Sequence, residues 1–416
     1  MSRECHDVIV VGGGPAGACA ATLVAREGHD VVLLERSAEP RFKIGESLMP
    51  ACYWSLERLG VLDRMKASAF TKKYSVQFFA SDGRPTAPFF FRDICDHESS
   101  QTWQVLRSDF DQMLLDNAAE AGVDVRRGVA VRDILFDGDR AVGVRAAAEG
   151  QPTEEISARV VVDASGQSSL LSRKLELRLH DRRLENASCF AHFRGAQRDE
   201  GDHEGATLVL HTRNRDSWFW YIPLHDDIVS VGVVGHLDYL VRRRSGTPQQ
   251  IFEEELALCP ALGARLEGAE QIRPAQVLKD FTYRSNRFGG DGWVVVGDAF
   301  GFIDPIYSSG VFLALKSGEY AADAINEGLA TGDLSAAQLG KYGQEYLDGM
   351  EAIRKLVYAF YDRDFSFGSF LKEHPECRTP IVHLLIGNVY REPVDDLFGP
   401  LSEVCDLPDE RPELVG

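Results

Sequence analysis

Long apolar runs and a leader-like N-terminus are both missing from this sequence of 416 residues. A membrane-spanning helix needs a run of about eighteen or more apolar residues, and no such run occurs. The N-terminus carries Glu4 and Asp7 and continues directly into an apolar strand pattern, so we expect no signal or targeting peptide. These absences favour a cytoplasmic protein without stable membrane insertion.

The cysteines show neither metal-binding nor disulfide patterns. Eight cysteines stand at positions 5, 19, 52, 95, 189, 259, 377 and 405, with no C-x-x-C pair and no close Cys/His cluster. Zinc sites and redox dithiols need such closely spaced ligands. We therefore predict reduced thiols and no metal site.

Positive charge is scarce in this chain. The 45 lysines and arginines are outnumbered by 64 aspartates and glutamates, so the formal net charge is −19. Such a chain repels a polyanion on average, and we expect no nucleic-acid partner. The length and the 44% of hydrophobic residues are sufficient for two or three packed domains.

The N-terminal segment HDVIVVGGGPAGACAATLVAREGHDVVLLER predicts a strand over 7–11, a helix over 15–27 and a second strand over 30–34. Its glycines have the G-x-G-x-x-G spacing, which supplies a tight turn, a bare backbone beside a pyrophosphate, and close helix–strand packing. The helix N-terminus would face the phosphates, and an acidic residue after the second strand would bind ribose hydroxyls. The predicted dinucleotide-binding residues are Gly12, Gly14, Pro15, Ala16, Gly17, Glu35 and Arg36. This unit alone does not separate FAD from NAD.

A second glycine-bearing passage, DGWVVVGDAFGFIDPIYSSGV, stands near residue 300. It resembles the G-D segment of flavoproteins of the aromatic hydroxylase superfamily. The resemblance implies that Gly297 and Asp298 meet the ribityl chain of FAD and that the next helix faces the flavin. The segment ARVVVDASGQSS, with Asp163, matches a third element of that superfamily. Together the three segments favour FAD.

Short runs rich in β-branched and aromatic residues fill the region from about 180 to 285, which predicts an antiparallel sheet. The resemblance implies the α/β fold class for the FAD-binding part and an α+β arrangement for the chain as a whole. A Rossmann-like FAD-binding domain would carry an inserted antiparallel sheet and a C-terminal helical segment. We expect the FAD-binding domain over 1–180 and 286–335, the substrate domain over 181–285, and the helical region with its acidic tail over 336–416. Apolar residues at helical spacing also predict one helical face over 53–65.

The stretch WFWYIP places Trp218 and Trp220 two residues apart. In a strand these two side chains share one face with Ile222, while Phe219 and Tyr221 point the opposite way. One interpretation is ordinary core packing between the sheet and the FAD-binding domain.

The other interpretation follows from a resemblance, because W-x-W-x-I-P is similar to the signature of the flavin-dependent halogenases. In that family it lines the passage between flavin and substrate. A second signature, F-x-x-P-x-x-S-x-G, is present as FIDPIYSSG. It implies FAD contacts from Pro305, Gly310 and Val311 and a halide site at Ser309 and Gly310, although an FAD-binding turn without halide has the same pattern.

Two further segments resemble the halogenases. RFKIGESLMP resembles the G-E-S loop, which implies that Arg41 and Ser47 serve the flavin, and Arg107 is a further candidate for the cofactor. AFTKKYSVQFF resembles the segment that holds the catalytic lysine, which implies Lys73 rather than Lys72. The alternative is a solvated lysine pair on a strand edge.

The resemblance implies a cytoplasmic halogenase of secondary metabolism. Reduced FAD, O2 and chloride or bromide would yield hypohalous acid, which Trp218 and Trp220 confine and Lys73 directs onto an electron-rich aromatic substrate. The chain is shorter than the free-tryptophan halogenases and has Tyr307 where they carry glutamate. This departure implies a phenol, a pyrrole or a carrier-protein-tethered arene, with a separate flavin reductase.

Three alternatives stay open at the level of sequence. A reductase resembling geranylgeranyl reductase shares the G-E-S loop but tends to carry Tyr-x-Trp-x-Phe-Pro. An aromatic monooxygenase would hydroxylate its substrate regardless of halide. A non-catalytic scaffold stabilised by FAD would show no redox turnover.

Overall fold

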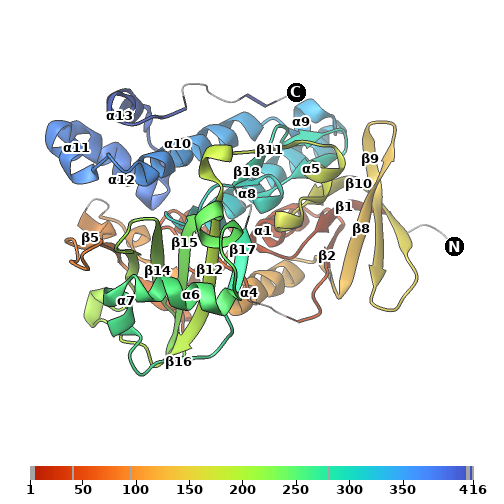
Figure 1. Cartoon of the computed structure of the whole chain (residues 1–416). Coiled ribbons are helices and arrows are strands. Elements are labelled where there is room, and N and C mark those ends of the chain that lie inside the picture. The colour runs from red at the N-terminus through yellow and green to blue at the C-terminus, as the bar shows by residue number, and fades with distance from the viewer. Residues whose placement is uncertain (1–4, 40–41, 94–95, 280–281, 409–412, 415–416) are drawn as a thin grey trace.

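The computed structural model describes residues 5–39, 42–93, 96–279, 282–408 and 413–414. Two large sheets dominate it, one toward the right of Figure 1 and one toward the lower left, with the C-terminal helices along the top. Within these described ranges, no helix is long and apolar enough to cross a membrane. The same ranges hold no group of three or more His, Cys, Asp and Glu side chains that could bind a metal.

The first sheet contains the predicted βαβ unit. Its strand order is β19–β20–β10–β1–β2–β7, and β8 and β9 continue it as a hairpin beside β10. The pairs from β20 to β7 are parallel. The strands are β1 (Cys5–Val11), β2 (Val31–Glu35), β7 (Asp124–Arg127), β8 (Val129–Asp137), β9 (Arg140–Ala148), β10 (Glu154–Asp163), β19 (Gly289–Gly290) and β20 (Trp293–Val295). Strands β1 and β2 are almost wholly buried, as expected for parallel strands that are covered on both faces.

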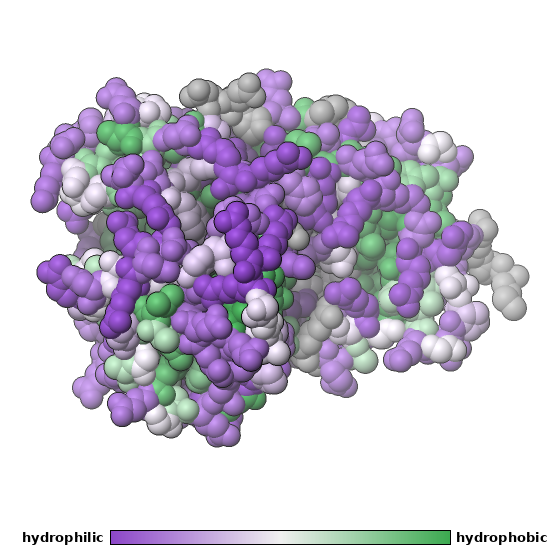
Figure 2. Space-filling view, in the orientation of Figure 1, coloured by the Kyte–Doolittle hydropathy of each residue, from purple (hydrophilic) through white to green (hydrophobic). Residues whose placement is uncertain are grey.

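Helices α1 (Pro15–Arg26), α4 (Arg107–Glu120) and α8 (Ser309–Thr331) pack together beside this sheet. Pro15 opens α1 at a position where no backbone N–H is needed, and Gly28 follows its end with φ +85°. The predicted α/β class with a Rossmann-type domain is confirmed. The side of the molecule shown in Figure 2 has a mostly hydrophilic surface, and hydrophobic residues gather on it beside β8 and β9.

The second sheet has the order β16–β12–β15–β14–β13–β4–β5, with β17 beside β12. All its pairs are antiparallel except β4 and β13, which are parallel. Strands β4 and β5 precede the range from which we predicted this sheet, so the sheet is wider than expected. Its strands are β4 (Ser75–Phe79), β5 (Phe89–Phe90), β12 (Asn186–Arg194), β13 (Thr207–His211), β14 (Ser217–Pro223), β15 (Ile228–His236), β16 (Glu270–Gln271) and β17 (Gln276–Lys279).

The two faces of β14 belong to different hydrophobic cores. Trp218, Trp220 and Ile222 join the large core that continues into the first sheet. Phe219 and Tyr221 join a separate core under helices α6 (Pro248–Ala257) and α7 (Pro260–Arg265). The alternation expected from the sequence is therefore present, and the tryptophan face looks toward the dinucleotide-binding unit.

Further helices follow α8 in the chain. Helix α10 (Gly343–Tyr361) contacts α8, and α11 (Phe367–Glu373), α12 (Arg378–Ile386) and α13 (Phe398–Val404) come after it (Figure 1). The single helix predicted over 53–65 is wrong. The chain forms α2 (Cys52–Arg58) and α3 (Leu62–Ala67) instead, because Gly60 takes φ +67° and ends the first helix.

The structure predicts that Gly232 in β15 does not tolerate a side chain. Gly232 is the cross-strand partner of Trp220, and a Cβ atom there would lie 2.2 Å from Cζ2 of the indole. Gly232→Ala should therefore lower the free energy of unfolding in urea by about 1–3 kcal/mol through overpacking.

Gly263→Ala is the matched control, since no atom lies within 4 Å of the Cβ position of Gly263 in α7. That substitution should leave the free energy of unfolding unchanged or raise it slightly. Equal destabilisation by both alanines would contradict the close packing of Trp220 on β15.

Candidate active site

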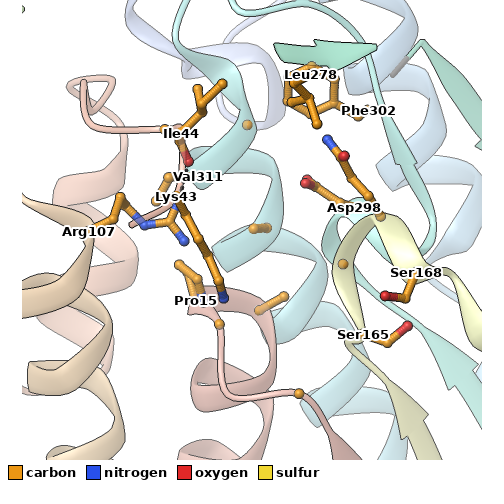
Figure 3. Close-up of a pocket in the computed structure, with 18 of the residues that line it drawn as sticks. Pro15, Lys43, Ile44, Arg107, Ser165, Ser168, Leu278, Asp298, Phe302 and Val311 are labelled. Atoms are coloured by element: carbon orange, nitrogen blue, oxygen red, sulfur yellow. Dashed lines mark hydrogen bonds between the residues drawn. The ribbon is translucent and has the colours of Figure 1, made fainter. Parts of the chain in front are cut away.

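A cavity of about 540 Å³ lies between the dinucleotide-binding unit and the tryptophan face of β14. Figure 3 shows Pro15, Lys43 and Arg107 on one side of it and Ser165, Ser168 and Asp298 on the other. Most of the predicted site residues line this cavity, namely Gly12, Gly14, Pro15, Ala16, Glu35, Arg36, Ser47, Arg107, Trp218, Trp220, Asp298, Pro305, Gly310 and Val311. The cavity thus collects residues that are up to 303 positions apart in the chain, from Val11 to Ala314.

Each glycine of the first motif has the geometry that its role requires. Gly12 has φ +106°, and a Cβ there would lie 2.4 Å from the carbonyl oxygen of Ala164. A Cβ on Gly17 would lie 2.0 Å from the carbonyl oxygen of Gly12, so this glycine packs α1 against the turn. Gly14 lines the cavity at the start of α1, and a Cβ there would meet only Nζ of Lys43, at 3.9 Å. A pyrophosphate can approach this bare backbone and helix N-terminus, so the site fits FAD.

Glu35 is held in place by main-chain donors. Its Oε2 accepts from Gly13 N at 2.8 Å and its Oε1 from Ser37 N at 2.8 Å. The carboxylate lines the cavity at the end of β2, and carboxylate oxygens there are suited to accept hydrogen bonds from ribose hydroxyls. Arg36 beside it donates to Ser168 Oγ at 3.4 Å.

Arg107 is fixed across the cavity at the start of α4. Its guanidinium donates to both carboxylate oxygens of Asp111, at 2.8 and 3.1 Å, and to the carbonyl of Ile44 at 2.6 Å. This bidentate pair orients a buried cation beside the G-E-S loop. Burial raises the pKa of Asp298 in the cavity to about 6, while Arg107 and Lys43 act in the opposite direction.

The two tryptophans turn their polar atoms away from the cavity. Trp218 Nε1 donates to the hydroxyl of Tyr361 at 3.0 Å, and Trp220 Nε1 donates to Ser230 Oγ at 3.2 Å. The ring centroids lie 6.5 Å apart with an interplanar angle of 58°. Since both N–H groups already have partners, the wall presents carbon surfaces to the cavity.

The N-terminus of α8 forms another part of the cavity. Ser308, immediately before it, has φ +58°, a left-handed conformation that costs a non-glycine residue of order 1 kcal/mol or more. Ser308, Gly310 and Val311 line the cavity, and the helix end offers N–H groups that suit an anion. Ser309, our predicted halide ligand, is 2% exposed and does not line it.

Lys73 is buried, whereas the alternative interpretation of the sequence placed both lysines in solvent at a strand edge. It lies in β3 (Thr71–Lys73), which pairs with β6 (Thr102–Gln104), and only 2% of the residue is exposed, whereas Lys72 is exposed. Its Nζ donates to Ser47 Oγ at 2.8 Å and to the carbonyl of Leu48 at 3.2 Å. Burial lowers the pKa of Lys73 to about 7, and nearby Cys52 acts in the opposite direction. Lys73 does not line the cavity but reaches its lining through Ser47.

Ser47 is further held by a buried polar network that the sequence did not indicate. Its hydroxyl is 3.0 Å from Thr207 Oγ1 on β13, and Gln104 Nε2 donates to the same threonine oxygen at 2.9 Å. A second buried contact joins Glu46 Oε1 to His192 Nε2 at 2.9 Å. Both contacts tie the G-E-S loop to the second sheet.

Several predictions fall outside the cavity lining. Gly17 and Gly297 pack the backbone, and a Cβ on Gly297 would lie 2.9 Å from Ala16 Cβ. Arg41 lies outside the described residues. We did not predict Lys43, Val129, Val131 or Leu278, which also line the cavity.

Comparisons with known proteins identify the family of this chain. A family model described as FAD binding domain matches residues 5–355. The 1H-pyrrole-2-carbonyl-(peptidyl-carrier protein) brominase of Pseudoalteromonas luteoviolacea is 33% identical over 388 residues, which cover 92% of each chain. The corresponding chlorinase of Pseudomonas fluorescens is 30% identical over 438 residues, covering 99% of this chain and 96% of the relative.

Solved structures give the same result. The myxobacterial chondrochloren halogenase superposes with a TM-score of 0.80 at 31% identity, covering 95% of this chain and 97% of that one. A flavin-dependent brominase superposes with a TM-score of 0.83 at 30% identity, covering 96% and 98%. The fold, the cavity and the family match define an FAD-dependent oxidoreductase. Within that class, the chain belongs to the flavin-dependent halogenases, which confirms the resemblance predicted from its motifs.

The lowered pKa of Lys73 predicts how stability depends on pH. An unfolded lysine has a pKa of about 10.4, so between pH 7 and that value the unfolded chain binds more protons than the folded one. The contribution of Lys73 to the free energy of unfolding therefore rises with pH between pH 7 and about pH 10.4, and it is constant below pH 7. Relative to Lys73→Met, the wild type should gain free energy of unfolding from pH 7 to pH 9.

Urea titrations of both proteins at pH 6, 7.5 and 9 measure this difference. Lys72→Met is the control, because it replaces an exposed lysine and keeps the buried Lys73, so the gain with pH seen in the wild type should persist in it. A difference between wild type and Lys73→Met that is flat or falls with pH would contradict a buried amine with a lowered pKa.

Proposed function

We propose that this flavin-dependent halogenase transfers chlorine or bromine, under the direction of Lys73, to a pyrrole or related electron-rich ring carried on a carrier protein. When bound in reduced form, FAD supplies with O2 the oxidising power that converts halide to hypohalous acid. A separate flavin reductase and a cytoplasmic location belong to the same proposal. The observation that carries it is the buried Lys73 amine, bonded to a serine of the cavity beside an apolar tryptophan wall.

The tryptophan wall suits the confinement of a small reactive oxidant. Hypohalous acid is lost if it reaches bulk water, so its passage needs a lining that excludes water and offers few polar contacts. Trp218 and Trp220 are 3% and 5% exposed, and both indole N–H groups are occupied. This supports the catalytic role that we predicted for the pair as a barrier, without acid or base chemistry.

Lys73 has the donors and acceptors that the proposal needs. As a neutral amine it carries two N–H groups, which the contacts to Ser47 Oγ and Leu48 O can use. The nitrogen lone pair is then free to accept a hydrogen bond from hypohalous acid or to take up halogen. A pKa near 7 keeps a large share of Lys73 in this neutral form at neutral pH.

The halide is proposed to bind at the N-terminus of α8. Main-chain N–H groups at Ser309, Gly310 and Val311 carry the positive end of the helix dipole and require no protein cation. Gly310 and Val311 line the cavity beside Ser308, which supports this placement. The side chain of Ser309 has no part in it.

The substrate class is inferred from the relatives. Two that match nearly the whole chain are named for pyrrole-2-carbonyl groups on a peptidyl carrier protein. Tyr307 in the F-x-x-P-x-x-S-x-G segment is buried, and its hydroxyl donates to the carbonyl of Leu356 at 3.1 Å. An ionised glutamate has no hydrogen to donate to that carbonyl, so this segment differs from that of the free-tryptophan halogenases, and we propose a substrate other than free tryptophan.

Loss of the Lys73 amine should abolish halogen transfer while sparing halide oxidation. With reduced FAD, O2, bromide and a carrier protein loaded with pyrrole-2-carbonyl, Lys73→Ala should form at least about 100-fold less brominated product than wild type, in the range of a lost catalytic group. Intact-protein mass spectrometry of the carrier measures the product.

Lys72→Ala is the matched control and should keep near wild-type activity, because its side chain is exposed on the opposite side of the strand. Equal losses in both variants would contradict a specific role for Lys73. Bromination of a free phenol but not of the loaded carrier would contradict the tethered substrate.

A further inference from the structure

A buried chain of hydrogen bonds leaves the indole of Trp218 and ends at a carboxylate. Trp218 Nε1 donates to Tyr361 at 3.0 Å, and the Tyr361 hydroxyl donates to Asp304 Oδ2 at 3.0 Å. The same carboxylate accepts from Asn186 Nδ2 at 2.9 Å and from Ile306 N at 3.0 Å. The chain crosses from β14 to the last residue of α10 and on to the segment before α8.

The carboxylate at the end of this chain is itself firmly held. Asp304 is 1% exposed, and its three donors come from β12, from α10 and from its own loop. Burial raises the pKa of Asp304 to about 6, and the three hydrogen bonds act in the opposite direction. A buried carboxylate needs such donors, so losing one of them is costly.

Trp218 depends on this chain in a way that Trp220 does not. Trp220 is fixed within its own sheet, by Ser230 and by its packing over Gly232. Trp218 has its polar partner on α10, in a different part of the chain. Its other aromatic neighbour there is Phe360, an edge contact with centroids 5.9 Å apart, which alone does not set the direction of the N–H group.

We propose that Tyr361 and Asp304 are positioning residues that hold the Trp218 indole in the wall of the cavity, whose interior is the passage that hypohalous acid would follow to Ser47 and Lys73. They keep its N–H group bonded to protein and its carbon face toward the passage. This inference rests on the proposed function, because the passage matters only if hypohalous acid crosses it. It also links the tryptophan motif to the F-x-x-P-x-x-S-x-G segment, to which Asp304 belongs.

The direct test uses Tyr361→Phe, which removes one oxygen and keeps the ring. In protein labelled with 15N-tryptophan, the Nε1–H resonance of Trp218 is identified by its loss in Trp218→Phe. Tyr361→Phe should shift that resonance and speed its exchange with solvent, and Asp304→Asn should shift it in the same direction. Tyr358→Phe is the matched control, since Tyr358 lies on the same helix and donates to Asp181 instead.

A second arm measures escape of oxidised halide into solution. With reduced FAD, O2 and bromide, monochlorodimedone in the solvent traps any hypobromous acid that leaves the protein. Tyr361→Phe should raise the trapped fraction by about fivefold, the population change expected when one hydrogen bond is lost. The rate at which the flavin is reoxidised should stay unchanged.

The two arms separate the possible failures. An unmoved Trp218 resonance in Tyr361→Phe overturns the positioning role, as does an equal shift in Tyr358→Phe. A moved resonance without increased escape overturns the claim that this orientation seals the passage. If wild type and variants all oxidise no bromide, the proposed function fails, whereas the resonance still decides whether Tyr361 holds Trp218.

Discussion

The hydrogen bond from Lys73 to Ser47 is the contact on which the rest of the site depends. It joins a short strand that pairs with β6 to the G-E-S loop, and through Thr207 it reaches the second sheet. A buried amine is tolerated only where it can give up its charge and still use its N–H groups. The G-E-S loop, β3 and the second sheet must therefore pack against one another, and the cavity forms where they meet.

The second constraint is the strict alternation of side chains along β14. One face of the strand belongs to the core beneath α6 and α7, and the other meets the dinucleotide-binding unit. Because Trp218 and Trp220 use protein oxygens for their N–H groups, the second face is both buried and apolar. The large indoles thus serve core packing and line the cavity at once, so the two interpretations from the sequence are compatible.

The sequence predicted features that depend on neighbouring residues. The turn at Gly12, helix α1 and the shared face of Trp218 and Trp220 follow from local spacing. It did not predict features that depend on contacts between distant segments of the chain. Gly60 divides a helical stripe, β4 joins the second sheet from a distant part of the chain, and Tyr361 bonds Trp218 across 143 positions. Nor could spacing show that Ser308 lines the cavity while the buried Ser309 does not.

The central claim is that halide is oxidised inside this cavity by reduced flavin and O2. The most direct measurement is rapid mixing of the reduced, FAD-loaded protein with O2, with and without bromide, while following flavin absorbance and bromine transferred to a trap. Bromide should change the course of flavin reoxidation, and oxidised bromine should appear in proportion to the flavin consumed. Identical traces with and without bromide, and all O2 recovered as hydrogen peroxide, would contradict it.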